Sequence, residues 1–267
     1  MSAPSSPVVH APPASWWGVR CVWLRYFDVF KKNLVFSMVT TIVEPLLYLA
    51  SFGLGLGAII NTLCVDGVTL TYRQFVFAGI LGQTVLFQAF FEAAYGGFVR
   101  MYYQRIFQAM AMTPITLAEV LWGELLWDAS KATFSAAAVL SIGVISGDFR
   151  FWGAVVMLPI AFVVALIFAS IGMLCAAKSE SIDQLSYPQF LFIFPMFLFC
   201  AVFYPLDNLP GWMQSVAWFL PLTALVSLTR TLTLGLPFVP FAAVVLLVWL
   251  AVLLVVARGA MRSRLVK

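Results

Sequence analysis

Residues 194–210 read FPMFLFCAVFYPLDNLP, and this stretch is the most informative part of the chain. It leads a phenylalanine-rich apolar helix directly into a turn that contains Pro205, Asp207 and Pro210. An aqueous loop does not carry so many phenylalanines, and a simple membrane anchor does not need three prolines around a single aspartate. The stretch therefore indicates a membrane helix that ends in a shaped turn at the outer membrane surface.

The composition of the whole chain points the same way. Hydrophobic residues make up 63% of the 267 residues and charged residues only 10%, and the mean hydropathy is +1.01. These values exclude an ordinary soluble globular domain. A hydrocarbon core of about 30 Å needs roughly 20 apolar residues per helix, so the chain has room for about six spans in one membrane domain.

Apolar runs along the chain predict these six spans and the fold class, an all-α polytopic membrane protein. The predicted spans are residues 34–60, 75–98, 117–146, 152–177, 186–204 and 236–257. They lie in a single domain of residues 16–260. Residues 1–15, rich in Pro, Ser and Ala, are expected to form a disordered cytoplasmic tail, and residues 261–267 a basic cytoplasmic tail.

Residues 16–32 are predicted to form an amphipathic helix ahead of the first span. Its large apolar residues recur at helical spacing, while its charged residues occupy one arc. The apolar residues are Trp16, Val19, Trp23, Tyr26, Phe27 and Phe30. We expect this helix to lie on the inner membrane surface, with its aromatic side chains at headgroup depth and its cations near anionic lipid.

Basic residues predict the orientation, because cytoplasmic loops carry an excess of Lys and Arg. With both termini in the cytoplasm, eleven basic residues lie on the inner side and three on the outer side. The inner residues are Arg20, Arg25, Lys31, Lys32, Arg100, Arg105, Lys178, Arg258, Arg262, Arg264 and Lys267, and the outer residues are Arg73, Arg150 and Arg230. The location of these charges matters more than the net charge of +4, and no nucleic-acid partner is predicted.

Charged residues inside the spans are candidates for function, because a charge within the bilayer is costly. Asp128 and Lys131 share one face of the third span and are predicted to form a buried ion pair that fixes helix register. A polar lining of a transport path or a proton relay are the alternatives. Glu44, Glu92 and Glu124 also lie in spans, and the sequence leaves their roles open. The third span is rich in small residues, so we expect it to be a packing centre.

What the sequence lacks narrows the function. It has no G-x-x-x-x-G-K-[ST] loop, so any ATP hydrolysis belongs to a separate chain. Its single histidine, His10, lies in the N-terminal tail, and its four cysteines have no metal or redox spacing. A membrane-embedded enzyme would need a convergent set of Asp, His or Cys residues, and a self-contained carrier would show an internal repeat. The sequence has neither.

Residues 100–114 form a short amphipathic segment on the predicted cytoplasmic side. Exposed Phe, Met and Arg side chains on a short helix suit insertion into a groove of a partner protein. The candidate contact residues for a soluble ATPase are Arg105, Phe107, Met110 and Thr113. Thr113 and Pro114 are also predicted to be the N-cap and the first residue of the next helix.

Six short motifs carry a family resemblance. They are MTPIT at 112–116, GELLWD at 123–128, FPMFLF at 194–199, FYPL at 203–206, LP at 209–210 and PLT at 221–223. Together they resemble the permease subunit of type-2 ABC exporters, and most closely the NodJ type, which exports lipo-oligosaccharide nodulation factors. The resemblance covers about residues 16–260.

This resemblance implies a homodimer of six-helix permeases in the bacterial inner membrane, with two copies of a separate NodI-like ATPase that binds ATP and Mg²⁺. Residues 101–113 would be the coupling helix, and residues 205–230 would include short helices that re-enter the outer leaflet. It also implies that aromatic side chains at the dimer interface line the substrate path. At matching positions these are Tyr48, Phe52, Phe87, Phe194, Phe197 and Phe199. No cofactor is implied for this chain itself.

The predicted function is that of a non-catalytic membrane subunit of an ATP-driven exporter for an amphipathic substrate, a lipo-oligosaccharide or another glycolipid in contact with membrane lipid. Export of a drug or another small hydrophobic molecule is the alternative within the same family. A membrane-embedded enzyme and a carrier are the alternatives from other classes.

Overall fold

Three helices are long and apolar enough to cross a membrane, counted over the residues that the structure describes. The structure is a computed structural model, and it describes residues 15–60, 62–65 and 67–265. The three helices are Tyr72–Tyr103, α5 (Leu117–Ile145) and α6 (Phe151–Lys178), and they pack against one another. They match the predicted spans 75–98, 117–146 and 152–177. The first consists of α3 (Tyr72–Phe91) and two π-helical segments, η3 (Glu92–Gly96) and η4 (Val99–Tyr103).

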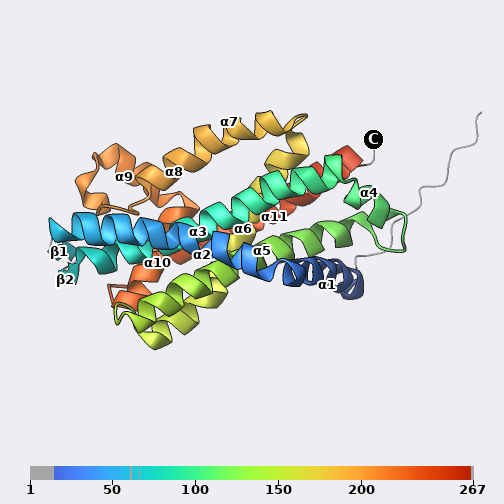
Figure 1. Cartoon of the computed structure of the whole chain (residues 1–267). Coiled ribbons are helices and arrows are strands. Elements are labelled where there is room, and N and C mark those ends of the chain that lie inside the picture. Colours follow the sequence, from blue (N-terminus) through green and yellow to red (C-terminus); the bar gives the residue numbers. More distant parts are fainter. Residues whose placement is uncertain (1–14, 61, 66, 266–267) are drawn as a thin grey trace, which may run out of the picture.

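The remaining elements pack against these three helices or extend from their ends (Figure 1). Toward the N-terminus they are α1 (Trp16–Lys32), α2 (Leu34–Tyr48), η1 (Leu49–Gly55), η2 (Leu56–Ala58), β1 (Thr62–Val65) and β2 (Val68–Thr71). The short helix α4 (Ile106–Ala111) lies between η4 and α5. After α6 come η5 (Ile182–Leu185), α7 (Ser186–Pro188), η6 (Gln189–Ile193), α8 (Phe194–Phe199), η7 (Leu206–Asn208), α9 (Gly211–Trp218), α10 (Pro221–Leu234) and α11 (Pro240–Leu265).

The other three predicted spans are helical over most of their length, but six spans are not confirmed. The span predicted at 34–60 corresponds to α2, η1 and η2, and the span predicted at 236–257 corresponds to α11. The prediction for the span at 186–204 places its end beyond the end of the observed helix. This helix ends at Phe199, because Ala201 takes a left-handed φ of 59° and the chain turns there. The pair α9 and α10 is apolar and bent by 85°, which is the geometry of a broken span or a re-entrant loop.

The predicted terminal tails are described only in part. Ser15 is the N-cap of α1, and its hydroxyl accepts a hydrogen bond from the Gly18 N–H. The rest of the predicted tail, residues 1–14, lies outside the described residues. At the other end α11 continues to Leu265, so residues 261–265 of the predicted basic tail belong to the last helix.

A two-stranded hairpin lies at one end of the bundle (Figure 1), and the all-α prediction did not include it. β1 pairs antiparallel with β2, with Thr62 opposite Thr71 and Val65 opposite Val68. Gly67 has a φ of 78°, a conformation that glycine adopts without steric cost. Alternating apolar and polar residues around an Asp-Gly pair are a strong hairpin signal, and the sequence holds this signal at 62–71.

The irregular segment after α8 lies against α3. A β-carbon at Gly79 would collide with the backbone carbonyl of Val202, so only glycine allows this approach. The Tyr72 hydroxyl donates a hydrogen bond to the carbonyl of Phe203 at 3.3 Å. These contacts hold residues 200–204 close to the bundle and determine where Phe203 lies.

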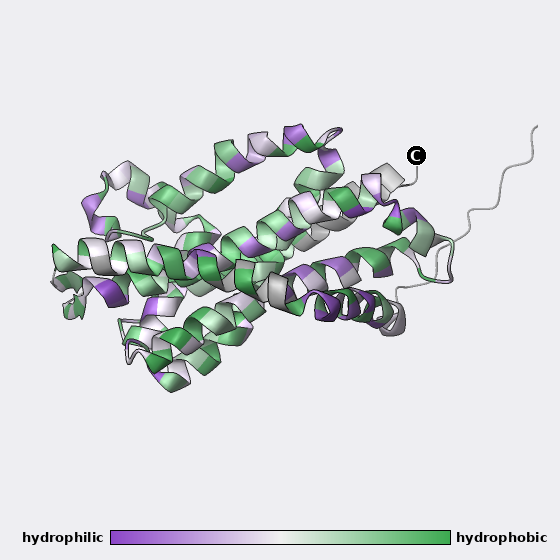
Figure 2. Cartoon of the chain, in the orientation of Figure 1, coloured by the Kyte–Doolittle hydropathy of each residue, from purple (hydrophilic) through white to green (hydrophobic). Residues whose placement is uncertain are grey.

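Helix α1 has the bounds predicted for the amphipathic helix, and its buried apolar residues pack on α5; its depth at the inner membrane surface stays a prediction. Tyr26 and Phe30 are buried, and their rings contact Trp127 of α5. Trp23 donates from Nε1 to the Ser130 hydroxyl at 3.1 Å. Hydrophilic and hydrophobic bands alternate along α1 (Figure 2). Helix α1 is therefore an integral layer of the bundle, and α5, which α1, α3 and α6 all contact, is a packing centre, as its small residues predicted.

Candidate functional site

Seven aromatic side chains form a continuous series of ring contacts, which we call the aromatic row. Neighbouring ring centroids in the row are 4.3 to 6.3 Å apart, separations at which aromatic pairs attract each other. In order of contact the members are Tyr48, Phe52, Phe203, Phe197, Phe87, Phe194 and Phe190. The row connects α2 and η1 through α3 to η6 and α8.

Local structure explains how the row is assembled. Tyr48 and Phe52 are one helical turn apart, as are Phe190 and Phe194, so each pair shares a helix face. The turn at Ala201 reverses the chain after α8. Phe203 thereby contacts Phe52 at 4.3 Å and Phe197 at 5.3 Å, and it joins two helical segments that are far apart in the sequence.

Five of the six predicted path residues belong to the aromatic row. The sixth, Phe199, is 40% exposed and makes no ring contact within the described part of the chain. Two members of the row, Phe190 and Phe203, were not among the predicted path residues, although Phe203 lies in the FYPL motif. The ring contacts occur within one chain, whereas the resemblance placed these residues between two copies. Their role in transport stays a prediction.

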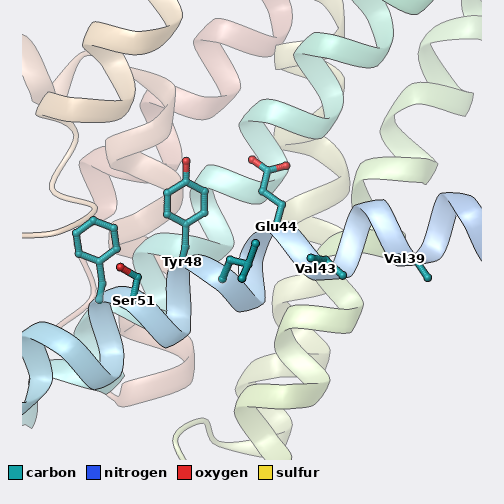
Figure 3. A pocket seen from close by; sticks show the side chains of 7 residues that line it. Val39, Val43, Glu44, Tyr48 and Ser51 are labelled. Carbon is teal, nitrogen blue, oxygen red and sulfur yellow. The ribbon is translucent and has the colours of Figure 1, made fainter.

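An open groove of about 600 Å³ borders the start of the row (Figure 3). It is lined by one face of α2 and η1, namely Val39, Val43, Glu44, Leu47, Tyr48, Ser51 and Phe52. In Figure 3 the Tyr48 ring and the Glu44 carboxylate project to the same side of the helix. The groove thus combines aliphatic side chains with a carboxylate and two hydroxyl groups, a surface suited to an amphipathic molecule.

A narrow polar gap lies next to this groove, between α2 and α3. Glu44 borders both the groove and the gap, and Gln83 and Thr84 face it from the middle of the Tyr72–Tyr103 helix. Gln83 is only 2% exposed, and its Oε1 makes no hydrogen bond within the described residues. Glu44, whose role the sequence left open, is therefore part of a polar contact region beside the aromatic row.

The charged residues of the second and third spans form one cluster around Arg100. Its Nε donates to Glu124 at 2.5 Å, its Nη1 to Glu92 at 2.8 Å and its Nη2 to Asp128 at 3.3 Å. Lys131 donates to the second oxygen of Glu92 at 2.5 Å. The predicted ion pair between Asp128 and Lys131 is therefore wrong. Asp128 pairs with Arg100 of η4, and Lys131 pairs with Glu92 of η3.

This charge cluster also contacts α1 and a cleft. The Arg100 guanidinium lies 5.3 Å from the Tyr26 ring centroid. Burial and the nearby Glu124 carboxylate raise the pKa of the Tyr26 phenol, which keeps its proton at neutral pH. A cleft of about 570 Å³ between α1 and η3–η4 is lined by Arg25, Tyr26, Arg100 and Lys131, among others. The cluster thus connects three helices at the end of the bundle where α1 lies.

The predicted coupling segment is only half exposed. Phe107 is fully buried and Met110 is 8% exposed, so both belong to the hydrophobic core. Describing these two side chains as exposed is therefore wrong. Arg105 and Thr113 are exposed, as predicted. Tyr103 and Met112, at 67% and 89% exposure, are large apolar side chains of this segment that face outward, and they were not among the predicted contact residues.

The N-cap of α5 lies three residues after the predicted one, Thr113. The N-cap is Thr116, whose hydroxyl accepts from the Glu119 N–H, and Thr113 bonds to the Met110 carbonyl instead. Glu119 completes a capping box and also accepts two hydrogen bonds from Ser15, at 2.7 and 2.6 Å. This single carboxylate therefore links the first turns of α1 and α5. The T-x-x-E pattern at 116–119 is the sequence signal for the capping box, whereas the bond to Ser15 has no local signal.

Within the described residues, no group of three or more His, Cys, Asp or Glu side chains is arranged to hold a metal ion. Cys175 and Cys200 lie in or beside apolar helices and are free thiols, as are Cys21 and Cys64. The candidate site is therefore built from aromatic, aliphatic and hydrogen-bonding groups.

Comparisons with known proteins agree with this architecture. The family model described as ABC-2 type transporter matches residues 19–234. Nodulation protein J from Rhizobium leguminosarum bv. viciae is 32% identical over 96% of this chain and 98% of its own length. Nodulation protein J from Rhizobium leguminosarum bv. trifolii is 34% identical over 82% of each chain. The inner membrane transport permease YadH from Escherichia coli (strain K12) is 22% identical over 84% of this chain and 86% of its own.

Proposed function

Because the chain belongs to the ABC-2 type transporter family, we propose that it is the permease subunit of an ATP-driven exporter. The proposed cargo is amphipathic, a lipo-oligosaccharide or glycolipid taken from the cytoplasm or the inner leaflet. The observation that carries this proposal is the aromatic row, which begins at the open groove on α2 and continues through α3 to α8. Aromatic faces suit both acyl chains and the apolar faces of sugar rings.

The energy comes from a separate NodI-like ATPase in two copies, since this chain has no phosphate-binding loop. The surface around Tyr103, Arg105, Met112 and Thr113 is the proposed contact with that subunit. These residues are exposed at the end of the bundle where α4 lies. Interfaces often depend on a few exposed aromatic, Met and Arg side chains, which this surface supplies.

Two connections could transmit movement of that surface into the membrane helices. Phe107 and Met110 anchor α4 in the core, so α4 cannot move without its neighbours α5 and η4. Arg100 lies in η4 only a few residues before the surface and is bonded to Glu124 and Asp128 of α5. A displacement caused by ATP binding would therefore reach α3 and α5 together, and α3 holds Phe87 of the aromatic row.

We further propose that two copies of the chain assemble, with both termini of each in the cytoplasm. The exposed face of α2 has no cover within the described residues, although Glu44 would be costly in contact with lipid. A second copy on this face would enclose the groove and turn it into a path. A small hydrophobic molecule is the alternative cargo, favoured by the aliphatic side chains of Val39, Val43 and Leu47 in the groove.

The division of labour is tested by ATP hydrolysis in proteoliposomes. The purified chain alone is expected to hydrolyse no ATP, and activity should require the separate ATPase and respond to the added glycolipid. A Met112→Ala variant should reduce the response to glycolipid, whereas Phe151→Ala, an exposed ring away from the proposed contact, should not. ATP turnover by the chain alone, free of contaminants, would contradict the proposal.

A further inference from the structure

Arg230 of α10 is a buried cation with no carboxylate partner. Arg230 is 7% exposed, and none of the ion pairs in the described part of the chain includes this residue. Its Nη2 donates to the carbonyl of Ala201 at 2.6 Å and approaches the carbonyl of Phe75 at 3.5 Å. The guanidinium carbon lies 3.6 Å from the Phe75 ring centroid. These contacts compensate only in part for the burial of the Arg230 charge, because a buried charge without a counterion is costly.

Two buried hydrogen-bond donors beside this charge have no oxygen or nitrogen acceptor among the described residues. Nε of Arg230 is buried and makes no hydrogen bond to any described residue. The Thr223 hydroxyl, on a residue that is 1% exposed, has no oxygen or nitrogen partner in the described chain and lies beside the Cys200 thiol. Thr223, Ser227 and Arg230 are at i, i+4 and i+7 of α10, so one helix face presents all three.

The same face lines a cavity of about 140 Å³. The cavity lies at the end of the bundle that carries the β-hairpin, and Val65 of β1 and Trp218 of α9 contribute to its walls. The guanidinium is a strong donor for oxyanions and can bind two of their oxygens at once. A volume of this size holds one such group. The Arg230 cation, the two buried donors without an oxygen or nitrogen acceptor, and the cavity therefore lie together at one place.

We propose that this cavity is a binding site for a phosphate-type oxyanion, held by Arg230 and Thr223 with Ser227 at its side. The anion is either the headgroup of a membrane phospholipid or free phosphate, and the site is independent of the exported cargo. Bound anion neutralises Arg230, which also holds the carbonyl of Ala201 and thus the turn that positions Phe203. Asp207 is exposed and also lines the cavity, so its carboxylate opposes anion binding.

The test measures binding to the purified full-length chain in mild detergent, by native mass spectrometry and by the shift of the unfolding temperature. The three arms are phosphatidylglycerol, a glucosyl diacylglycerol without phosphate, and inorganic phosphate. We expect the phospholipid to bind and the phosphate-free lipid to bind at least tenfold more weakly. Competition by inorganic phosphate alone would identify the free anion as the ligand, and its failure to compete would identify the lipid headgroup.

The variants separate binding from folding. Arg230→Gln should weaken binding at least tenfold, while Arg150→Gln, an exposed arginine near the same end, should leave it unchanged. If Arg230→Gln does not fold, Thr223→Val decides, because it removes a hydroxyl that has only the weakly accepting Cys200 thiol beside it and keeps the Arg230–Ala201 contact; it should weaken binding about threefold or more. Asp207→Asn should strengthen binding. Equal binding by Thr223→Val and the unchanged chain, or equal binding of both lipids, would overturn the proposal.

Discussion

Arg100 and Glu124, which are 24 residues apart in the sequence, are joined by a 2.5 Å hydrogen bond from Nε to Oε1. Glu124 is fully buried in α5, and Arg100 lies in η4 just before the exposed surface at the end of the bundle where α4 lies. The bond therefore connects the predicted ATPase contact with the helix that α1, α3 and α6 all touch.

Replacing Arg100 by Gln should strongly destabilise the protein. The change leaves the buried carboxylates of Glu124 and Asp128 without their cation, and loss of one partner of a buried ion pair typically costs about 3–5 kcal/mol. The triple variant Arg100→Gln, Glu124→Gln, Asp128→Asn should be more stable than the single one, because it removes the uncompensated charges. Thermal unfolding in lipid nanodiscs measures the difference, and a triple variant less stable than Arg100→Gln would speak against this cluster.

Lys131 should be coupled energetically more strongly to Glu92 than to Asp128. A double-mutant cycle with Glu92→Gln and Lys131→Met should give a coupling energy of about 0.5–3 kcal/mol, the usual range for contacting residues. The matched cycle with Asp128→Asn and Lys131→Met should give a clearly smaller value. The reverse order of the two coupling energies would restore the pair predicted from the sequence.

Phe107 and Met112 should give opposite results when each is changed to Ala. Phe107 is fully buried, so its truncation should lower the free energy of unfolding by about 3–5 kcal/mol. Met112 is exposed, so its truncation should leave the unfolding temperature unchanged and weaken ATPase binding. Pull-down of the ATPase and thermal unfolding of each variant provide the two readouts. A stable Phe107→Ala variant that loses the ATPase would instead support the original assignment.

Glu119→Gln should loosen α1 from the bundle. The amide cannot accept on both sides, so the hydrogen bonds from Ser15 or those from Thr116 are lost, at about 1.5–3 kcal/mol for each bond to a charged group. Hydrogen exchange of the first turns of α1 and α5 should accelerate. Ser15→Ala removes a single hydroxyl donor and serves as the milder comparison. Unchanged exchange in Glu119→Gln would show that α1 is held by its ring contacts alone.

The sequence predicted the parts of this protein that depend on local chemistry. The family resemblance is confirmed, and α1, α5 and α6 begin and end within one residue of their predicted ranges, because apolar length and charge pattern determine them. The ion-pair partners of the buried charged residues could not be predicted in this way. Asp128 and Lys131 are close in sequence, yet Arg100 and Glu92 approach them only after α3 and α5 have packed together.

The face that a short helix presents was equally hard to predict. Phe107 and Met112 lie in the same short segment, and six residues of helix do not show which side meets the core. The aromatic row was recovered in large part because the family resemblance implied path residues on the first, second and fifth predicted spans. Phe203 was not among the predicted path residues, because its position depends on the left-handed turn at Ala201. The local sequence does not indicate this backbone conformation.

The most direct test of the account is ATP-driven movement of a fluorescent lipo-oligosaccharide across proteoliposomes that contain the chain and its ATPase. Phe197→Leu and Phe52→Leu remove rings from the aromatic row and keep apolar volume, and each should slow transport at least fivefold without loss of ATPase binding. Phe168→Leu, a fully buried ring outside the row, controls for the effect of altered packing and should transport normally. Transport by Phe197→Leu and Phe52→Leu at the rate of the unchanged chain would contradict the assignment of the aromatic row as the export path.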